Sequence, residues 1–519
     1  MTSVHRSQSL RAHVITPVLW SQSLPAHVIT LYIGLSLYAF TYFKKCYSVL
    51  SDLGINGPKP KILFGNATDF KNRFPLDVFQ EWTKQYGKVF GYYEGLRPSI
   101  VVSDPEIIKE ILVKQFDKFY IRPLTQPFMY HPEDKSIIVT HGTQWKRERV
   151  FIGGAFKPNI LMQMVPRLMQ TAATLLDLLE ERRQKSPDGF NLSECLKMYV
   201  LESLATAAFG YRSDCLTNSD NVLTRYTQAS AVSASAHNSV TGLARLFPTL
   251  TPLLKVFDRH HRLSFQEYMK DITSHVTQQV RLIRDSNTKP SNILQHMILA
   301  TSSCKDSEEK HVIEERMSEE AIVTQTSALI GGASAVTQAL IQFLTHALME
   351  HPGVQQKVYT EIQQHCQTEA IDYHDLSRLK YLDMVIKETL RHYTVAPGVA
   401  RVCTEDCQIS GFHFKKGITV RLMSSTINFE EEYFPQAQQF TPERFQTPSS
   451  YAWMPFGHGP RMCVGQRLGL LQVKAAIVKI LQKFIIFPSK ETEIPLVLAL
   501  MPVLIPKNGI HVKLMPRST

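Results

Sequence analysis

The sequence predicts a mainly α-helical protein with a small β region, organised as one large domain. Stretches with helical periodicity dominate the chain, and short runs rich in β-branched and aromatic residues lie towards its N-terminal side. An apolar content of 44% and a charged content of 20% are typical of a globular core with a large helical share. A chain of 519 residues could hold several domains, but no Gly/Ser-rich linker divides it, so we expect a single one.

The N-terminal extension, residues 1–25, contains a near-perfect repeat. SQSLRAHVIT at Ser7–Thr16 is followed by SQSLPAHVIT at Ser21–Thr30. Two copies cannot bury a core between them as solenoid repeats do. We therefore expect this extension to be disordered or to reflect a duplicated coding segment.

Residues 26–43 read AHVITLYIGLSLYAFTYF and contain no Asp, Glu, Lys or Arg. A helix of this length extends about 27 Å, close to the thickness of the hydrocarbon core of a bilayer. The segment therefore predicts a transmembrane anchor helix. A cleaved signal peptide is the alternative, but no small-residue cleavage site follows Phe43.

The segment after the anchor, residues 44–62, is basic and contains prolines. Lys44 and Lys45 follow the anchor directly, and the positive-inside rule then leaves the C-terminal body on the cytosolic side. Pro58 and Pro60 cannot continue a helix. We predict a hinge over residues 44–62 and the main domain over residues 63–519.

Within the main domain the pattern predicts a small sheet followed by many helices. The runs VFGYYEG and SIVVSD (Ser99–Asp104) are the predicted strands. The predicted helices are Pro166–Gln184, Tyr268–Asp285, Glu319–Glu350, Pro352–Cys366 and Tyr381–His392. Two stretches of low complexity or high polarity, Gln228–Gly242 and Ser302–His311, are predicted to be loops.

Cysteine usage and charge narrow the function classes. The eight cysteines are scattered without a CxxC pair, which argues against a disulfide framework and a zinc site and favours a reducing compartment. The net charge is +11, from 57 basic and 46 acidic residues. No basic patch interleaved with aromatic residues is visible, so we expect no nucleic-acid partner. A membrane surface and an acidic partner protein account better for the excess charge.

The segment PFGHGPRMCVGQRLG, Pro455–Gly469, carries the clearest chemistry. A cysteine sulfur binds iron as a thiolate, so its loop must donate N–H groups, exclude water and approach a flat macrocycle closely. The glycines of this loop permit that approach, Phe456 can pack on the ring, and Arg461 offers a guanidinium to a heme propionate. An inert buried cysteine is the alternative. Because FGxGxRxCxG is met at every fixed position, the segment predicts Cys463 as the metal ligand to heme b, iron protoporphyrin IX.

This segment resembles the heme-binding loop of the cytochromes P450, and other family signatures occur upstream in the expected order. Glu388 and Arg391 form an ExxR pair on one helix face. In the family the arginine of the TPERF segment, here Arg444, joins that pair in a buried ionic network under the heme loop. We therefore interpret these three residues as structural, because breaking such a network leaves an uncompensated buried charge.

The resemblance also implies contacts to the heme propionates. Trp145 and Arg149 in WKRER lie at i and i+4, which places an indole N–H and a guanidinium on the same helix face. By resemblance to the third helix of the family, both side chains should reach the propionates. Arg401, just after VAPGVA, matches another family arginine that points at them.

The resemblance covers about Leu53–Met515 and is most similar to the animal microsomal branch that holds thromboxane synthase and the drug- and steroid-oxidising liver enzymes. It implies the cytochrome P450 fold and a monooxygenase that oxidises a lipophilic small molecule with O₂. Electrons would come from NADPH–cytochrome P450 reductase, a flavin reductase. The protein would be a single-pass protein of the endoplasmic reticulum membrane with its catalytic domain in the cytosol.

The long helix Glu319–Glu350 departs from the family pattern. Monooxygenases of this family usually carry AGx, an acid and then one or two threonines, because an acid–alcohol pair delivers protons during oxygen activation. Counting back without gaps from His351 aligns Ala335 with the acid and Val336 and Thr337 with the threonines. Shifting by one places Ser334 on the acid and Ala335 on the alcohol. Neither register supplies a carboxylate, so Thr337 or Ser334, with ordered water, is the remaining candidate relay.

Three functions therefore stay open. The first is the membrane-anchored monooxygenase. The second is an isomerase or dehydratase of a lipid peroxide, which needs no reductase, and the third is a heme-binding protein with little turnover. An apolar substrate pocket is expected from the long helix and its surroundings, namely Ser136–Thr140, the roof region near Gln228–Gly242, Ala396–Ala400 and Met501–Leu504.

Overall fold

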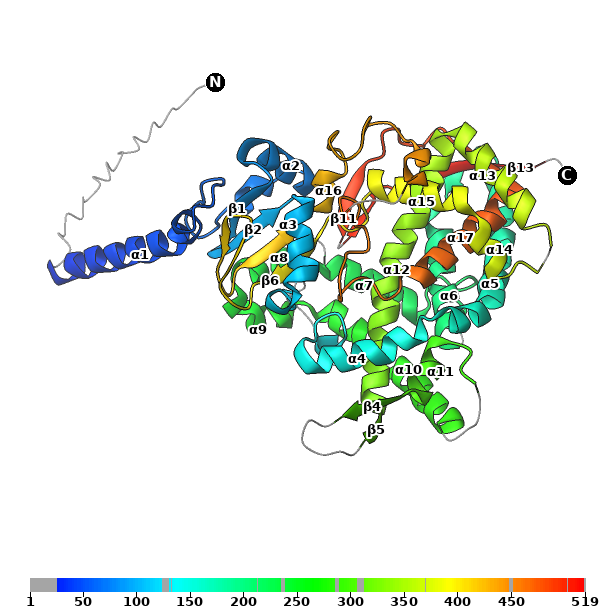
Figure 1. The fold of residues 1–519 in the computed structure, drawn as a ribbon, viewed down its shortest axis with the longest axis horizontal. Coiled ribbons are helices and arrows are strands. Elements are labelled where there is room, and N and C mark those ends of the chain that lie inside the picture. The colour runs from blue at the N-terminus through cyan, green and yellow to red at the C-terminus, as the bar shows by residue number, and fades with distance from the viewer. Residues whose placement is uncertain are drawn as a thin grey trace, which may run out of the picture.

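The computed structural model describes residues 26–123, 130–131, 133–211, 213–234, 239–284, 289–305, 312–368, 370–447, 451–501 and 503–517. A large helical body carries a small β region at the end where helix α1 leaves it (Figure 1). This confirms the predicted mainly α-helical fold with a small β region. The predicted extension over residues 1–25 lies outside the described residues.

The helices form most of the body and are joined by short connections. They are α1 (Ala26–Asp52), α2 (Pro75–Tyr86), α3 (Pro105–Lys109), α4 (Gly142–Ala155), α5 (Pro158–Lys185), α6 (Ser193–Ser203), α7 (Val222–Ala234), α8 (Ser239–Leu246), α9 (Thr251–Leu254), α10 (Arg259–Ile283), α11 (Ile293–Leu299), α12 (Glu319–Glu350), α13 (Pro352–His365), α14 (Tyr373–Arg378), α15 (Lys380–His392), α16 (Ser424–Ile427) and α17 (Gln466–Lys483). Short 3₁₀ and π turns, among them η2 (Glu110–Lys114), η4 (Glu133–Lys135), η6 (Pro248–Leu250), η7 (Lys255–Phe257) and η8 (Pro442–Gln446), connect them.

The strands form one four-stranded sheet and several smaller ones. They are β1 (Val89–Glu94), β2 (Arg97–Val102), β3 (Phe190–Asn191), β4 (Thr301–Lys305), β5 (Val312–Arg316), β6 (Val399–Val402), β7 (Cys407–Ile409), β8 (Phe412–Phe414), β9 (Thr419–Leu422), β10 (Phe484–Pro488), β11 (Leu498–Met501), β12 (Val503–Pro506) and β13 (His511–Pro516). The main sheet has the order β1-β2-β9-β6, in which β2 and β9 are parallel and the other pairs antiparallel. This sheet brings the start of the main domain next to residues more than 300 positions later, since Ile100 pairs with Val420.

Several element predictions are confirmed and others are wrong. The two predicted strands are β1 and β2, and the predicted helix Glu319–Glu350 is α12. The predicted loop Gln228–Gly242 is wrong where α7 and α8 occupy it, because its many alanines favour a helix. The predicted loop Ser302–His311 is wrong where β4 pairs with β5. Backbone hydrogen bonds hold these two polar strands together, so they lack the alternating apolar residues by which a strand is recognised in a sequence.

Two helices begin earlier than predicted. Helix α5 begins at Pro158 rather than Pro166, and α10 begins at Arg259 rather than Tyr268. Proline is favoured in the first turn of a helix, and here Pro158 fills that place while Pro166 lies inside the helix. The early part of α5 packs into the body through Ile160 and Leu161, a contact that local pattern does not reveal, whereas Arg259, Arg262 and Leu263 at the start of α10 are exposed.

Helix α12 is the central element of the body (Figure 1). Ser318 caps its start by accepting a hydrogen bond from the N–H of Ala321 at 3.2 Å. Helices α6, α10, α15 and α17 pack around it. Among the described residues, α12 is the helix long and apolar enough to cross a membrane, but 61% of its most apolar window is buried inside the body. Its hydrophobicity is therefore explained by its place in the core.

Helix α1 extends past the predicted anchor and projects from the body (Figure 1). It continues to Asp52, so residues 44–52 of the predicted hinge are helical. The end of the helix is held against β1, because Tyr93 Oη accepts from the N–H of Leu50 at 3.1 Å and donates to the carbonyl of Tyr47 at 3.0 Å. Because these contacts fix the end of the helix to β1, only the part of the predicted hinge after Asp52 remains outside a helix.

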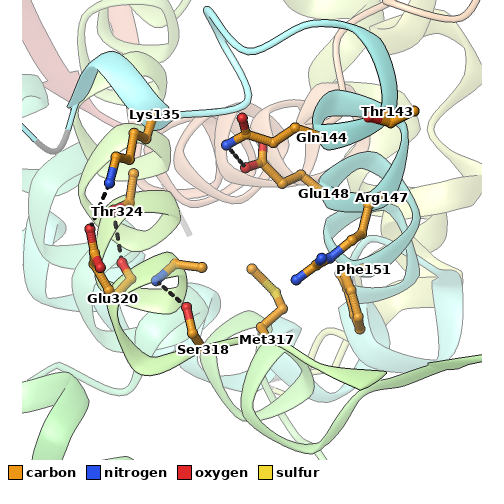
Figure 2. Close-up of a pocket in the computed structure, with 11 residues that line it drawn as sticks. Lys135, Thr143, Gln144, Arg147, Glu148, Phe151, Met317, Ser318, Glu320 and Thr324 are labelled. Carbon is orange, nitrogen blue, oxygen red and sulfur yellow. Dashed lines mark hydrogen bonds and ion pairs between the residues drawn. The ribbon is translucent and has the colours of Figure 1, made fainter. Parts of the chain in front are cut away.

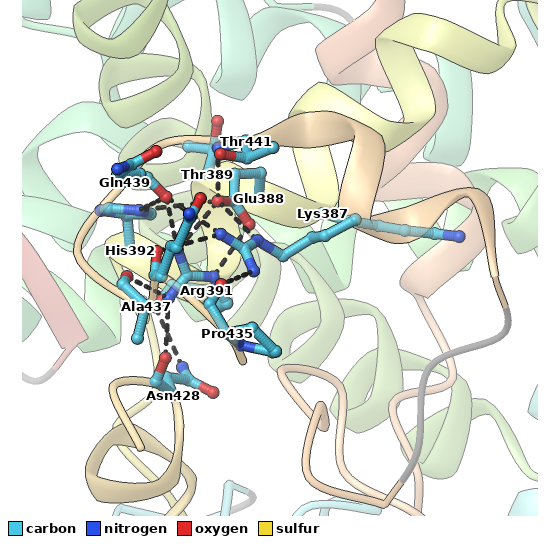
Figure 3. Close-up of polar contacts among 12 residues, drawn as sticks. Lys387, Glu388, Thr389, Arg391, His392, Asn428, Pro435, Ala437, Gln439 and Thr441 are labelled. Atoms are coloured by element: carbon cyan, nitrogen blue, oxygen red, sulfur yellow. Dashed lines mark hydrogen bonds and ion pairs between the residues drawn. The ribbon is translucent and has the colours of Figure 1, made fainter. Parts of the chain in front are cut away.

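A buried ionic network joins α15 to the loops that precede Cys463 (Figure 3). Glu388 and Arg391 are fully buried, and the two bonds between carboxylate and guanidinium are both 2.8 Å long. Arg444 of η8 donates from Nε to Glu388 Oε1 at 3.1 Å. Arg391 also donates to the carbonyls of Asn428 and Ala437 at 2.7 and 2.8 Å. The network predicted from ExxR and TPERF is thus confirmed, and it ties distant loops to one helix.

We expect Glu388→Gln to destabilise the protein strongly, because it leaves two buried guanidinium groups without their counter-charge. The loss should be about 3–5 kcal/mol in free energy of unfolding, measured by urea denaturation followed by far-UV circular dichroism. Glu443→Gln is the matched control, since Glu443 pairs with Lys357 at 2.8 Å on the surface. The control should lose about 1 kcal/mol or less. Equal losses in the two variants would contradict the structural role of Glu388.

Candidate active site

The loop that carries Cys463 closes tightly on itself before α17 begins. The N–H of Cys463 donates to the carbonyl of Phe456 at 2.9 Å. Gly459 has a positive φ of 73°, and a side chain there would overlap the carbonyl of Leu112 in η2. Only glycine satisfies both conditions at this position. The loop is therefore held between η2 and the start of α17, with Cys463 at its end.

Solvent reaches the Cys463 side chain although protein surrounds much of it. Burial raises the pKa of this thiol, while the N–H of Gly465 and the charges of Arg122 and Arg149 act in the opposite direction. A thiol in this setting becomes a thiolate when a metal ion binds it, because the metal then stabilises the negative charge. Accessible sulfur, donated N–H groups and nearby cations are what a thiolate ligand requires.

Four guanidinium groups gather near the cysteine loop, and we call them the arginine cradle: Arg122, Arg149, Arg401 and Arg461. The charges of Arg122 and Arg149 act on the Cys463 sulfur, while Arg401 and Arg461 act on each other and on Arg122. They come from four segments, namely the stretch before residue 124, helix α4, strand β6 and the cysteine loop. Arg122 Nη2 donates to the carbonyl of Arg461 at 3.0 Å, and Arg149 Nη2 donates to the carbonyl of Met462 at 2.9 Å. The Arg461 guanidinium lies 4.4 Å from the centre of the Trp145 ring. The cradle therefore wraps the side of the loop on which Cys463 lies.

The electrostatics of the cradle are unfavourable without an anion. Burial, followed by the charges of Arg122 and Arg461, lowers the pKa of Arg401 to about 9. Burial, followed by Arg122 and Arg149, lowers the pKa of Arg461 to about 10. Such shifts are those expected of like charges held together in a desolvated site.

Unsatisfied donors show what the cradle can hold. Arg401 and Arg461 are 2% and 3% exposed. Within the described residues, Nε of Arg401 and Nε and Nη1 of Arg461 have no hydrogen-bond partner. Buried donors of this kind require acceptors, and their positive charge favours carboxylates. A flat macrocycle with two propionates, lying against the Cys463 sulfur, fits this set of residues.

Small residues of helix α12 lie close to the arginine cradle. A β-carbon added to Gly332 would lie 3.4 Å from Cδ1 of Ile138, whose carbonyl accepts a hydrogen bond from Arg122 of the cradle at 3.4 Å. Further along, Thr337 Oγ1 lies 3.7 Å from the corresponding position on Gly469 of α17. The segment 331–337 therefore runs between the cradle side and the start of α17, and it presents glycine and alanine where a ligand would lie.

Residues 55–514 match the model of the family described as Cytochrome P450. The chain belongs to the cytochrome P450 family. It is 30% identical over 491 residues to Cytochrome P450 3A28 of Bos taurus, and the alignment covers 92% of this chain and 94% of that relative. It is also 30% identical over 487 residues to Cytochrome P450 3A7 of Homo sapiens, with 91% and 93% covered. Cytochrome P450 3A12 of Canis lupus familiaris is similar, at 29% identity over 491 residues, with 92% and 94% covered.

Membership confirms several predictions from the sequence. This cytochrome P450 has the P450 fold in a single large domain, and it is a heme-thiolate monooxygenase, an oxidoreductase whose cofactor is heme b. The resemblance to the animal branch with drug- and steroid-oxidising enzymes is confirmed by the 3A relatives. The residue assignments rest on the geometry described above, since family membership by itself places no side chain.

The structure brings the predicted cofactor residues of this P450 together. Trp145 and Arg149 come from α4, Arg401 from β6, and Phe456, Arg461 and Cys463 from one loop. Arg122 joins them but was missed by sequence reasoning, because it lies outside every recognised motif. The only local signal is a lone basic residue in the otherwise uncharged stretch YIRPL. Its role depends on folding next to a loop more than 300 residues away.

The two predicted relay candidates lie on α12 with different partners. Ser334 and Thr337 are 6% and 5% exposed. Ser334 Oγ donates to the carbonyl of Gly331 at 3.1 Å, one turn earlier. Tyr226 of α7, which the sequence did not single out, lies beside that turn, since a β-carbon on Gly331 would be 3.3 Å from its phenol oxygen. Hydroxyl groups therefore occupy the region in which the family usually places an acid.

A separate cavity of about 420 Å³ lies between α4 and the first turn of α12 (Figure 2). Its lining is mixed polar and apolar: Lys135, Thr143, Gln144, Arg147, Glu148, Phe151, Met317, Ser318, Glu320, Ala321 and Thr324. None of the predicted cofactor contacts lines it, although Trp145 and Arg149 lie on the same helix. This cavity is therefore distinct from the cofactor site.

Proposed function

We propose that this cytochrome P450 is a membrane-anchored enzyme that oxidises a lipophilic small molecule with electrons from NADPH–cytochrome P450 reductase, and that Cys463 is its iron ligand. The observation that carries the assignment is the arginine cradle. Its buried, unpaired donors belong to Arg401 and Arg461, whose charges act on Arg122, and Arg122 in turn acts on the accessible Cys463 sulfur. No other ligand chemistry explains a thiol and several desolvated guanidinium groups in one place as well as heme b does.

Each residue of the site has a distinct task in this proposal. When bound, heme b supplies the redox-active iron at which the substrate is oxidised. Cys463 would bind the iron as a thiolate, and the N–H of Gly465 would stabilise its charge. The cradle guanidinium groups and the indole N–H of Trp145 would hold the two propionates, and Phe456 would pack on the macrocycle. Because the cradle arginines come from four segments, cofactor binding also locks these segments together.

The surroundings of α12 favour an uncharged, lipophilic substrate. Ile138 of the segment Ser136–Thr140 lies beside Gly332 of α12 and is 41% exposed. The N–H of Leu504 in β12 donates to the carbonyl of Val395, directly before the segment Ala396–Ala400, at 2.8 Å. These are segments that the sequence predicted to line the pocket. Aliphatic side chains at such positions select by shape and desolvation rather than by charge.

Membrane association is supported by apolar side chains at one end of the molecule. Helix α1 exposes a continuous set, namely Leu31, Tyr32, Ile33, Leu35, Leu37, Tyr38, Phe40 and Tyr42. The body exposes a second set around α9, namely Leu250, Leu253, Val256 and Phe257. Strand β2, whose partner β1 receives α1, also contacts α8, through a hydrogen bond from Arg97 to the carbonyl of Arg245. We place α1 in the endoplasmic reticulum membrane, with a single span and the catalytic domain in the cytosol.

Docking of an acidic reductase is supported by charge. The chain carries a net charge of +11, and Arg467 at the start of α17 is exposed next to the cysteine loop. Charge complementarity of this kind orients electron-transfer partners and speeds their encounter. The proposed docking face is therefore the side of the molecule on which the Cys463 loop reaches the surface.

One observation favours a second candidate function. Ala335 and Val336 stand where the family usually carries an acid and an alcohol, so proton delivery has no carboxylate at that position of α12. An isomerase or dehydratase of a lipid peroxide needs neither that pair nor a reductase. The experiments below separate the two functions.

We expect Cys463→Ser to abolish the absorption band that the reduced carbon monoxide complex of a thiolate-ligated heme produces. A serine hydroxyl is a poor ligand for this iron, because it does not ionise readily at neutral pH. Cys407→Ser is the control, since this partly buried thiol lies in β7 outside the site, and it should keep the band. An unchanged spectrum in Cys463→Ser would show that another residue binds the iron.

Deletion of residues 1–45 should release much of the protein from membranes and leave heme binding intact, because α1 docks on β1 through residues after Lys45. Flotation with vesicles measures the bound fraction. The remaining binding should fall further when Leu253, Val256 and Phe257 are replaced by serine in the shortened protein. Full retention of the shortened protein on membranes would refute α1 as the main attachment.

In the wild-type enzyme we expect poor coupling of NADPH consumption to product formation, with much of the reducing power released as peroxide or water. The double change Ala335→Glu and Val336→Thr restores an acid and an alcohol in the gapless register. A general acid–base contribution is typically about 10²-fold, so a monooxygenase limited by proton delivery should gain coupling.

The matched control is Ala335→Gln with Val336→Thr, which has the same shape but no acidic proton and should gain little. A peroxide isomerase should gain nothing from the glutamate and should consume an organic hydroperoxide without NADPH. Tight coupling in the wild-type enzyme would refute the premise that proton delivery is impaired.

A further inference from the structure

Glu148 is a buried carboxylate that lies between the cavity of Figure 2 and the arginine cradle. It is 8% exposed and belongs to α4, one residue before Arg149. Its Oε2 accepts a hydrogen bond from Thr140 Oγ1 at 2.7 Å, and its Oε1 accepts one from Gln144 Nε2 at 3.1 Å. Both carboxylate oxygens are thus held in fixed positions, with one edge of the side chain facing the cavity.

Thr140 connects this carboxylate to the cradle. Its hydroxyl bonds Glu148, and its backbone carbonyl accepts a hydrogen bond from Nη2 of Arg461. The remaining donors of Arg461, Nε and Nη1, are the unpaired atoms assigned above to a propionate. A shift of Glu148 therefore moves Thr140, and with it the guanidinium that holds the cofactor.

Charge balance gives Glu148 a second task. The cradle has four guanidinium groups, whereas the two propionates supply two negative charges, because the thiolate charge is matched by the positive charge of a ferric porphyrin. The Glu148 carboxylate acts on Arg461 electrostatically and raises its pKa, against the effects of burial and of the other arginines. An ionised Glu148 thus reduces the excess positive charge of the site, and a protonated one leaves that excess larger.

Glu148 can also exchange protons with solvent through the cavity that it lines. Burial raises the pKa of its carboxyl above the usual value of 4.5, while bonds from Thr140 and Gln144 lower it. The other charged groups facing it are Arg147 of its own helix and, across the cavity, Lys135 and Glu320. Lys135 and Glu320 pair with each other at 3.1 Å, and His131 lies 3.5 Å from the same carboxylate of Glu320.

We propose that Glu148 is a positioning residue for Arg461 and that its charge, controlled by protons entering through the cavity, sets the reduction potential of the cofactor. This inference rests on the proposed cofactor site. Above its pKa the carboxylate is negative and opposes the arrival of an electron, so the potential is lower. Below its pKa the carboxyl is neutral, the cradle charge is less compensated, and the potential is higher.

The test measures the midpoint potential of the purified heme-loaded protein by spectroelectrochemical titration between about pH 5 and pH 8. The wild-type potential should fall as pH rises through the pKa of Glu148. Glu148→Gln should lose this step and should lie above wild type at pH 8, converging with it at low pH. Glu320→Gln is the matched control in the same cavity wall, and it should retain the step because Glu320 does not bond Thr140.

A second variant makes the proposal independent of how well Glu148→Gln folds. Thr140→Val removes the hydroxyl that stabilises the carboxylate but keeps Glu148, so the step in potential should move to higher pH. Identical potentials and identical pH profiles in wild type, Glu148→Gln and Thr140→Val would overturn the inference. Loss of the thiolate-type carbonyl band in the wild-type protein would instead refute the proposed function itself.

Discussion

The convergence of buried positive charge beside one cysteine is the constraint on which the rest of the structure depends. Guanidinium groups repel one another and lose hydration when buried, so they stay together only if rigid surroundings and an anion compensate. Here the surroundings are helix α4, strand β6 and the cysteine loop, held in place by backbone acceptors such as the carbonyls of Thr140 and Met462. Binding of heme b then contributes to the stability of the fold as well as to its chemistry.

A second charged network differs from the arginine cradle, because all of its partners are within the protein. Glu388, Arg391 and Arg444 satisfy one another and the carbonyls of the loops around them. No donor of the Arg391 guanidinium is left for a ligand in Figure 3. The contrast between a closed ionic network and an open one distinguishes structural arginines from ligand-binding ones, although both kinds are buried to a similar degree.

Helix α12 has two roles, because one part of it forms the core and another part passes the cofactor site. Its C-terminal half is a core helix, with Leu340, Phe343 and Leu344 almost fully buried. The segment 331–337 instead passes the cofactor site, where glycine and alanine leave space and no carboxylate is present. A buried acid on this helix would cost desolvation energy. The chain avoids that cost, and under the proposed function protons then come from hydroxyl groups or the substrate.

The sequence by itself determined the features that depend on neighbouring residues. The spacing around Cys463, the ExxR turn and the apolar run of α12 follow from local geometry, and the structure places them as predicted. Tertiary structure alone decided which side chains meet from distant segments. Arg122 joins Arg461, and Glu148 reaches the same arginine through Thr140, because folding brings residues 122 and 140 against a loop more than 300 positions later. Local pattern encodes backbone periodicity, whereas burial and long-range contacts set the charge of a site.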